Sequence, residues 1–301
     1  MDDVRVLIAG SAGQVARALA DTAPATGLHV TALGRPHLDL TEPASINAVL
    51  DKVRPDVVIN AAAYTAVDQA ETDEAGAFAL NAEGSGQLAA AAARLGAPIL
   101  HLSTDYVFDG SKPAPYAETD PVAPLGVYGR SKLAGEEAVA AANPRHLIFR
   151  TAWVYSPVGK NFAKTMLRVA EARGALSVVH DQVGNPTSAA DIAAALWKIA
   201  GRITADPSAL RPGTYHMTAS GEASWAEFAE EIMRVSANLG GPSASVARIT
   251  SAEYPTPTRR PANSRLDCTK LSRQFGVILP HWQTSTRACV EELVRTRGWE
   301  S

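Results

Sequence analysis

The chain is poor in cysteine and carries no excess of either charge. Only Cys268 and Cys289 occur in 301 residues, and they form neither a disulfide framework nor a zinc-binding spacing, so we expect two reduced thiols. Lysine and arginine number 28 and aspartate and glutamate 31, for a formal net charge of -3. This balance gives no reason to expect nucleic acid or an anionic membrane as a partner. The 7 histidines show no metal-ligand spacing, so we assign no residue to a metal.

Long apolar runs and a secretory signal are also missing. The N-terminus, MDDVRVLIAG, begins with acidic residues, whereas a secretory signal begins basic and continues into a longer apolar run. The alanine-rich stretch QLAAAAARLGAPIL is interrupted by Arg94, Gly96 and Pro98 before it reaches membrane-spanning length. We therefore expect a cytoplasmic protein with no membrane partner. With 46% hydrophobic and 20% charged residues, the chain is globular rather than disordered.

The first half of the chain alternates short apolar runs with longer mixed segments. The runs are VRVLIAG, HVTAL, DVVINAAAY, PILHLST and HLIFRTAWVY. Nearly continuous apolar strands that alternate with helices predict an α/β fold with a doubly wound parallel sheet. After about residue 205 the sequence becomes rich in proline and glycine. We expect a nucleotide-binding domain over residues 1–155, a segment returning to its sheet near 187–204, and a smaller C-terminal substrate-binding lobe over most of 156–301.

A glycine loop opens the chain. In VLIAGSAGQVARAL a strand runs directly into a helix, with Gly10, Gly13 and Ala16 at three-residue steps. Small residues let the backbone approach a pyrophosphate, whose charge then meets the first amides of the helix. A plain tight turn is the alternative, but a loop after the first strand of an alternating chain favours a dinucleotide. The expected contacts of this loop are Gly10, Ser11, Ala12, Gly13 and Gln14.

The end of the second strand indicates which dinucleotide is bound. An acidic residue there would hold the ribose hydroxyl of NAD, but ALGRPHLDL places Arg35 at that point. A guanidinium can pair with a 2'-phosphate, so the sequence favours NADPH, with NADH as a possible second cofactor. Arg35 as an ordinary solvated charge remains the alternative. Asp39 comes late for the ribose, and we expect it to face the adenine edge beside Leu40.

Tyr128 and Lys132 lie one helical turn apart in PLGVYGRSKLAGEE. At this spacing a phenol and an ammonium share one face of a helix. One interpretation is an ordinary surface helix, and the other is a tyrosine acid assisted by a neighbouring cation. Free tyrosine titrates near ~10, and a cation within about 4–6 Å would lower that pKa. The pair alone does not decide between these interpretations.

Further motifs give the chain a family resemblance. STDYVFDG, YGRSKLAGE, RTAWVYS, KNFAKTML, DQVGNPTSA and RPANSRLD, together with the glycine loop, resemble the extended short-chain dehydrogenase/reductases and, more narrowly, the dTDP-4-dehydrorhamnose reductases. The likeness runs from the glycine loop to about residue 275, with Ala16 in place of a third glycine. It implies a Rossmann domain, a dTDP-sugar substrate and reduction of the C4 ketone of dTDP-4-dehydro-6-deoxy-L-mannose by NADPH.

The resemblance also implies a role for individual residues. Tyr128 would be the proton donor, Lys132 would bind the nicotinamide ribose, and Thr104 would hydrogen-bond the substrate carbonyl. The residues that it places on the cofactor are Ala63, Tyr64, Thr65 and, through its backbone, Leu102. Those that it places on the sugar nucleotide are Asp105, Trp153 and, with Arg259 beside it, Arg260. A turn cap, a core position and solvated arginines are the respective alternatives.

Some members of this family use magnesium, but the paired acidic residues of this sequence are typical of helix surfaces, so a magnesium requirement is doubtful. Two other functions remain open from the sequence. One is a different nucleotide-sugar reductase or epimerase on the same fold. The other is a non-catalytic subunit similar to the regulatory subunit of methionine adenosyltransferase, which the intact Thr104, Tyr128 and Lys132 disfavour. The sequence does not decide between a monomer and a homodimer.

Overall fold

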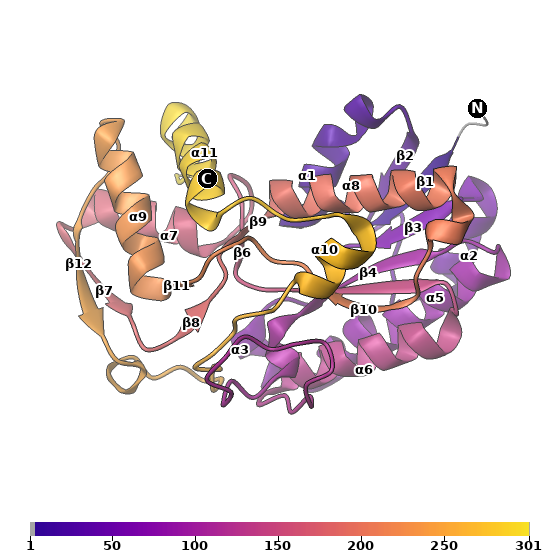
Figure 1. Cartoon of the computed structure of the whole chain (residues 1–301), viewed down its shortest axis with the longest axis horizontal. Helices are drawn as coiled ribbons and strands as arrows, with labels where there is room; N and C mark the ends of the chain where they lie inside the picture. Colours follow the sequence, from indigo (N-terminus) through magenta and orange to yellow (C-terminus); the bar gives the residue numbers. More distant parts are fainter. Residues whose placement is uncertain (1–3, 301) are drawn as a thin grey trace.

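The apolar runs of the first half form the strands of one parallel sheet (Figure 1). The computed structural model describes residues 4–300. The sheet has the order β10-β5-β4-β3-β1-β2, so the chain moves outward in one direction from β1 to β2 and in the other from β3 to β10. Its strands are β1 (Arg5–Ala9), β2 (His29–Leu33), β3 (Val57–Asn60), β4 (Ile99–Thr104), β5 (His146–Thr151) and β10 (Gly213–His216). This confirms the predicted doubly wound fold.

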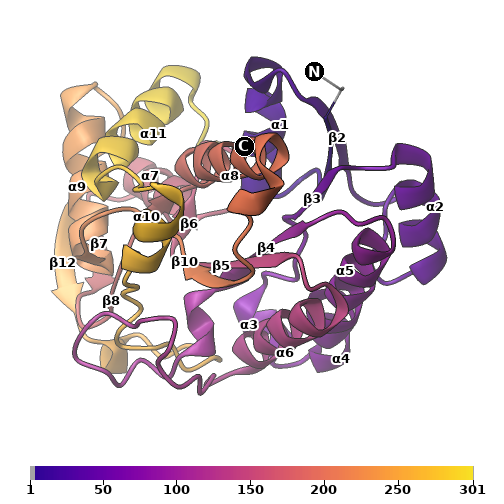
Figure 2. The same ribbon diagram turned by 45° about the vertical axis from the view of Figure 1, so that its right-hand side comes forward.

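Helices cover both faces of the sheet, which explains why the strands are apolar on both sides (Figure 2). Helices α1 (Gln14–Thr22) and α8 (Ala189–Ala205) pack together on one face. Helices α2 (Pro43–Val53), α5 (Ser85–Arg94) and α6 (Val127–Ala142) lie on the other. Shorter helical segments connect them: η1 (Ala23–Thr26), α3 (Val67–Ala70), α4 (Glu74–Phe78), the π-helical η2 (Ala79–Gly84), η3 (Asp105–Val107) and η4 (Pro207–Ala209).

A second lobe lies beside the sheet and has its own apolar core (Figure 1). It is built from helices α7 (Phe162–Ala172), α9 (Trp225–Asn238) and α11 (Trp282–Thr296), with strand β7 (Ala175–Val179) pairing with β12 (Ser245–Ile249). Buried side chains at helical spacing, including Phe228, Ile232 and Leu293, fill the space between these helices. Its short pieces are β6 (Val154–Tyr155), β8 (Val183–Gly184), β9 (Thr187–Ser188), β11 (Ala223–Ser224) and η5 (Ser251–Glu253).

The two lobes are not separated by a single crossing of the chain. After α8 the chain adds β10 to the edge of the main sheet, enters the second lobe, and returns as α10 (Thr269–Phe275). Tyr215 on β10 contacts the ring of Phe275 edge-on, with centroids 5.2 Å apart. Residues 213–216 pair in parallel with β5 and so belong to the main sheet, which the sequence patterns did not predict.

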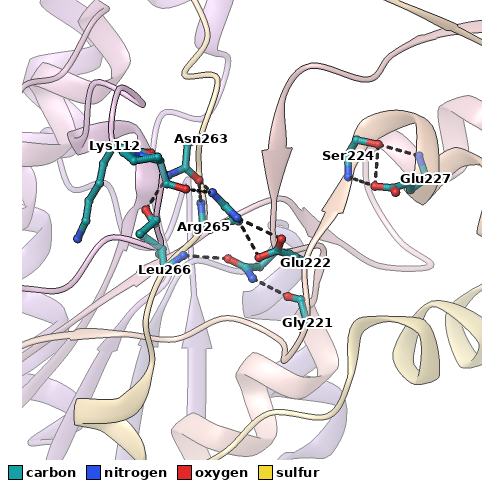
Figure 3. A network of polar contacts seen from close by, with 11 residues as sticks. Lys112, Gly221, Glu222, Ser224, Glu227, Asn263, Arg265 and Leu266 are labelled. Carbon is teal, nitrogen blue, oxygen red and sulfur yellow. Dashed lines mark hydrogen bonds and ion pairs between the residues drawn. The ribbon is translucent and has the colours of Figure 1, made fainter.

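A polar network fixes the loops where the lobes meet (Figure 3). The buried Asn185 donates to the carbonyl of Gly221 and accepts from the amide of Leu266. Asn263 donates to the carbonyl of Lys112 at 2.6 Å. Its neighbour Arg265 pairs with Glu222 at 3.1 Å. Thus DQVGNPTSA and RPANSRLD hold loops from distant parts of the chain together.

The same view includes the start of α9, where Ser224 and Glu227 form a capping box (Figure 3). Helix α8 is capped by Ser188, whose hydroxyl accepts from the amide of Ala190. None of the helices between residues 4 and 300 combines the length and the apolar character that crossing a bilayer requires.

Candidate active site

A cavity of about 700 Å³ opens at the carboxyl ends of the parallel strands, where the strand order reverses between β1 and β3. Ligands of open α/β sheets bind in this position. Its wall brings together residues that lie far apart in the sequence. The expected site residues on it are Gly10, Ser11, Ala12, Gly13, Gln14, Arg35, Asp39, Leu40, Ala63, Thr65, Leu102, Thr104, Asp105, Tyr128, Lys132 and Trp153.

The glycine loop passes closely over the backbone of the neighbouring strand end. Gly10 has φ +115°, and a Cβ there would lie 3.2 Å from the backbone of Ala61, so both the conformation and the space favour glycine. Its amide donates to the carbonyl of Leu33, which ties the loop to β2. Gly13 precedes α1 without any side-chain cap, so the first amides of α1 face the cavity. Ala16 is fully buried at the helix–strand contact.

Two charged residues follow the end of β2, the exposed Arg35 and Asp39, whose carboxylate accepts hydrogen bonds from Thr41. Arg35 lies on the cavity wall and is exposed. Hydrogen bonds from the amide and hydroxyl of Thr41 lower the pKa of Asp39, with a smaller contribution from the charge of Arg35. Leu40 is buried, and its carbonyl lies where a Cβ on Gly84 would clash. Asp39 therefore remains ionised beside Arg35 at neutral pH.

Helix α6 carries Tyr128 in its first turn and Lys132 one turn later. The Lys132 side chain is only 2% exposed, and its Nζ donates to the carbonyl of Leu102 at 2.7 Å. Burial lowers the pKa of Lys132 to about 8, although the charge of Glu136 acts in the opposite direction.

Tyr128 does not show the depressed pKa that the sequence analysis expected from a neighbouring cation. Burial raises the pKa of Tyr128 to about 12. A hydrogen bond with Thr104 lowers this pKa and the charge of Asp105 raises it, and both effects are smaller than that of burial. The expectation is wrong because desolvation of the phenolate dominates, while the ammonium of Lys132 is bound to the backbone of β4.

Asp105 and Tyr106 follow Thr104 directly and complete the wall around Tyr128. Asp105 is 3% exposed, and burial raises its pKa to about 6 against hydrogen bonds from Ser264 and Thr104. The ring of Tyr106 meets that of Tyr128 edge-on, with centroids 5.5 Å apart and an angle of 77°. A carboxyl group, a hydroxyl and two phenols therefore face one region of the cavity.

Trp153 forms an aromatic surface that both lobes support. Its ring stacks on Trp225 of the second lobe at a centroid distance of 3.6 Å and an angle of 7°. A Cβ on Gly184 would lie 2.5 Å from the same ring. Trp153 also has φ 50°, which is uncommon for a bulky residue and typical of functional sites. The residue lies on the cavity wall instead of inside a core.

Comparison with known proteins agrees with this architecture. A family model described as RmlD substrate binding domain matches residues 4–295. The chain belongs to this family. It is 51% identical over 292 residues to the dTDP-4-dehydrorhamnose reductase of Sinorhizobium fredii, covering 97% of this chain and 98% of that protein. It is 45% identical to the enzyme of the same name from Burkholderia thailandensis, covering 97% and 99%.

Solved structures of the same name have the same fold as this RmlD family member. A dTDP-4-dehydrorhamnose reductase from Clostridium acetobutylicum superimposes with a TM-score of 0.89 at 38% identity, covering 96% of this chain and 99% of that one. One from Bacillus anthracis, solved in complex with NADP, gives 0.88 at 32% identity with the same coverage. The family resemblance read from the motifs is thereby confirmed.

In this RmlD family member, two expected site residues lie off the cavity wall. The side chain of Tyr64 packs against the apolar cluster of Ala70, Ala77 and Val127, and its backbone amide and carbonyl are both bound by Asn81. Arg260 pairs with Asp68 at 3.4 Å. Neither Tyr64 nor Arg260 lines the cavity. A motif resemblance does not distinguish a residue that faces a ligand from a neighbour that supports the wall.

The cavity of this RmlD family member also includes residues that the sequence analysis missed. Ser103, Tyr106, Thr151, Gly159 and Lys160 all line it. The loop before α7 is tied to the glycine loop, because the side-chain oxygen of Gln14 accepts from Ser156 at 2.9 Å and from Asn161 at 3.0 Å. A glycine followed by a lysine in the loop VGKNF was the available signal, but nothing local related this loop to Gln14, which lies 147 residues before Asn161.

Among the described residues, no group of three or more histidine, cysteine, aspartate or glutamate side chains is placed to hold a metal ion. Cys268 and Cys289 are both free thiols.

Proposed function

We propose that this chain is an NADPH-dependent dTDP-4-dehydrorhamnose reductase, which reduces the C4 ketone of dTDP-4-dehydro-6-deoxy-L-mannose to give dTDP-L-rhamnose. One observation carries the proposal: a single cavity contains both the glycine loop and the group formed by Thr104, Tyr128 and Lys132. The names of the relatives, at up to 51% identity over nearly the full chain, support the same activity.

The residues present fit a dinucleotide. At one end of the cavity, the close backbone approach at Gly10 and the uncapped start of α1 suit a pyrophosphate. Arg35 at the tip of β2 suits a 2'-phosphate, which favours NADPH over NADH. Lys132 at the other end would hold the nicotinamide ribose with the N–H groups not used by Leu102. The bound nicotinamide would supply the hydride that the reduction requires.

Tyr128 would supply the proton. As the carbonyl carbon is reduced, negative charge develops on its oxygen, and a hydroxyl donor from Thr104 would stabilise that charge. Since burial raises the pKa of Tyr128 to about 12, the phenol is protonated throughout the neutral range. An alkoxide is more basic than a phenolate, so transfer of the phenolic proton to the substrate oxygen is favourable. The phenolate would then recover a proton from solvent.

The sugar nucleotide would lie between the two lobes. Trp153, stacked on Trp225, offers a flat apolar surface that suits the methyl-bearing face of a deoxysugar. Asp105, with its carboxyl group at the cavity wall, would bind a sugar hydroxyl. Arg260 contacts Asp68 outside the cavity, so a role with the substrate diphosphate would need that ion pair to open.

The test is an assay of the purified full-length chain with dTDP-4-dehydrorhamnose and each reduced cofactor. We expect consumption of NADPH in equal amount to the dTDP-L-rhamnose formed, with slower consumption of NADH. An epimerase would convert a nucleotide sugar without net cofactor consumption. Cofactor binding without any turnover of this substrate would contradict the proposed activity.

A further inference from the structure

A buried ion pair lies directly behind the proposed catalytic residues. Glu136 on α6 and Arg150 on β5 have side chains only 5% and 6% exposed. The Arg150 guanidinium binds the Glu136 carboxylate in a bidentate manner, with Nε donating to Oε1 at 2.8 Å and Nη2 donating to Oε2 at 2.6 Å. Ser103 on β4 donates a further hydrogen bond to Oε1 at 2.5 Å. Burying two charges costs free energy of desolvation that their attraction often only offsets, so a buried ion pair is weak evidence for a role in stability alone.

The pair joins the elements that carry the proposed chemistry. Three successive residues of β4 each form a hydrogen bond with α6. The carbonyl of Leu102 accepts from Lys132, and the hydroxyl of Ser103 donates to Glu136. The side chain of Thr104 forms a hydrogen bond with Tyr128. These contacts fix α6 against β4 at successive residues of the strand. Glu136 thus joins Ser103 of β4 to the helix that carries Tyr128.

The charge of Glu136 opposes the larger effect of burial on the pKa of Lys132. The two lie one turn apart on α6, so they share a face. The two buried histidines of this region are uncharged at neutral pH, because burial lowers the pKa of His101 on β4 well below its ordinary value and that of His216 on β10 to about 3. Asp105 beyond β4 is ionised above about pH 6, and its charge acts on Tyr128.

We propose that Glu136 is a positioning residue that keeps the buried ammonium of Lys132 charged and seated on β4, and that Arg150, by pairing with the same carboxylate, limits this effect of Glu136 on Lys132. The inference rests on the proposed role of Lys132 in binding the nicotinamide ribose. On this proposal, the Glu136–Arg150 pair sets the pH range over which Lys132 stays charged, in addition to packing α6 on the sheet.

The experiment measures the dissociation constant of NADPH as a function of pH by fluorescence titration of the full-length protein. Binding should weaken as Lys132 loses its proton with rising pH. Glu136→Gln removes the favourable charge and leaves Arg150 unpaired, so the midpoint should fall by roughly one pH unit or more. Arg150→Met leaves the carboxylate facing Lys132 alone, so the midpoint should rise. The double variant should lie between the two single variants.

The second lobe offers a control, a buried carboxylate paired with a half-exposed arginine. Glu231 is 7% exposed, and its carboxylate accepts hydrogen bonds from Nε of Arg234 at 2.8 Å and from Nη2 of Arg234 at 2.6 Å. Glu231→Gln should lower the urea midpoint of unfolding and leave the pH midpoint of NADPH binding unchanged. Glu231→Gln and Glu136→Gln each remove a buried carboxylate that binds an arginine. A shift in the pH midpoint that only Glu136→Gln shows is therefore an effect on Lys132 and not a general loss of stability.

Opposite shifts in the two single variants support the inference, and shifts in the same direction, or none, overturn it. If Glu136→Gln alone does not fold, the double variant is compared with Arg150→Met, because these two proteins differ only in the charge at position 136. The pH midpoint of NADPH binding must then be lower in the double variant than in Arg150→Met. Turnover of the sugar nucleotide is assayed separately. Opposite shifts without turnover would contradict the proposed activity and leave the role of Glu136 standing.

Discussion

Gly135 on α6 offers a prediction in which structure and helix propensity disagree in sign. A Cβ at this position would lie 2.1 Å from the carbonyl oxygen of Asn81 and 3.1 Å from its carbon. Both are backbone atoms of the π-helical segment η2, so no side-chain rotation can relieve the overlap. The substitution Gly135→Ala therefore requires α6 and η2 to move apart.

Propensity alone would make Gly135→Ala stabilising by ~1 kcal/mol, since alanine is the better helix former. Inserting a methyl group into a packed interior costs about 1–3 kcal/mol, and contact with backbone places this case at the upper end. We expect a net loss of about 2 kcal/mol in the free energy of unfolding, after the propensity gain is subtracted. Because Asn81 also donates to Ser131 at 3.0 Å, the shift should reach the helical turn between Tyr128 and Lys132 and weaken NADPH binding.

Urea unfolding followed by circular dichroism measures the first effect, and fluorescence titration the second. Gly201→Ala on α8 is the matched control, because a Cβ there meets nothing within 4 Å. That variant should be more stable than wild type by roughly 0.5–1 kcal/mol and bind NADPH normally. If Gly135→Ala were as stable as Gly201→Ala, the close packing of α6 on η2 would be refuted.

Three substitutions at the cavity wall test the proposed roles. Tyr128→Phe should leave folding and NADPH binding intact and lower kcat by ~10²–10⁴-fold, and full activity would contradict its role as the acid. Arg35→Ala should raise the KM for NADPH and leave that for NADH nearly unchanged, whereas equal losses would show that Arg35 does not contact the 2'-phosphate. Trp153→Ala should raise the KM for the sugar nucleotide in a protein that still folds and binds NADPH; unfolding would instead assign Trp153 to the shared core of the two lobes, where it stacks on Trp225.

Local sequence signals predicted the parts of the fold that depend on local physics. Strands β1, β3 and β4 are buried on both faces, and their apolar runs are legible for that reason. Strand β10 was missed because GTYH alternates weakly and lies between proline- and glycine-rich loops. It becomes a strand only by pairing with β5, about 65 residues earlier in the chain, and a short window does not contain that partner.

The candidate site followed the same division. Gly10 was predicted from local geometry, a close backbone approach directly after a strand, whereas Thr104 and Asp105 were assigned through the family resemblance. Lys160 was missed because its place on the wall depends on hydrogen bonds between Gln14 and the loop before α7. Tyr64 was assigned to the cofactor through the family resemblance, whereas its side chain packs against a small apolar cluster and does not line the cavity.

The pKa of Tyr128 illustrates why spacing does not determine electrostatics. The four-residue separation from Lys132 correctly places both residues on one face of α6, but it says nothing of how deeply that face is buried. Burial raises the pKa of Tyr128 to about 12 and lowers that of Lys132 to about 8, so each group moves toward its neutral form. Tyr128 consequently keeps its proton well above neutral pH, whereas Lys132 loses its charge as the pH rises through about 8. The alkaline limit of the proposed reaction is therefore expected to follow from Lys132 and its neighbour Glu136, and the tyrosine remains a competent acid on both sides of it.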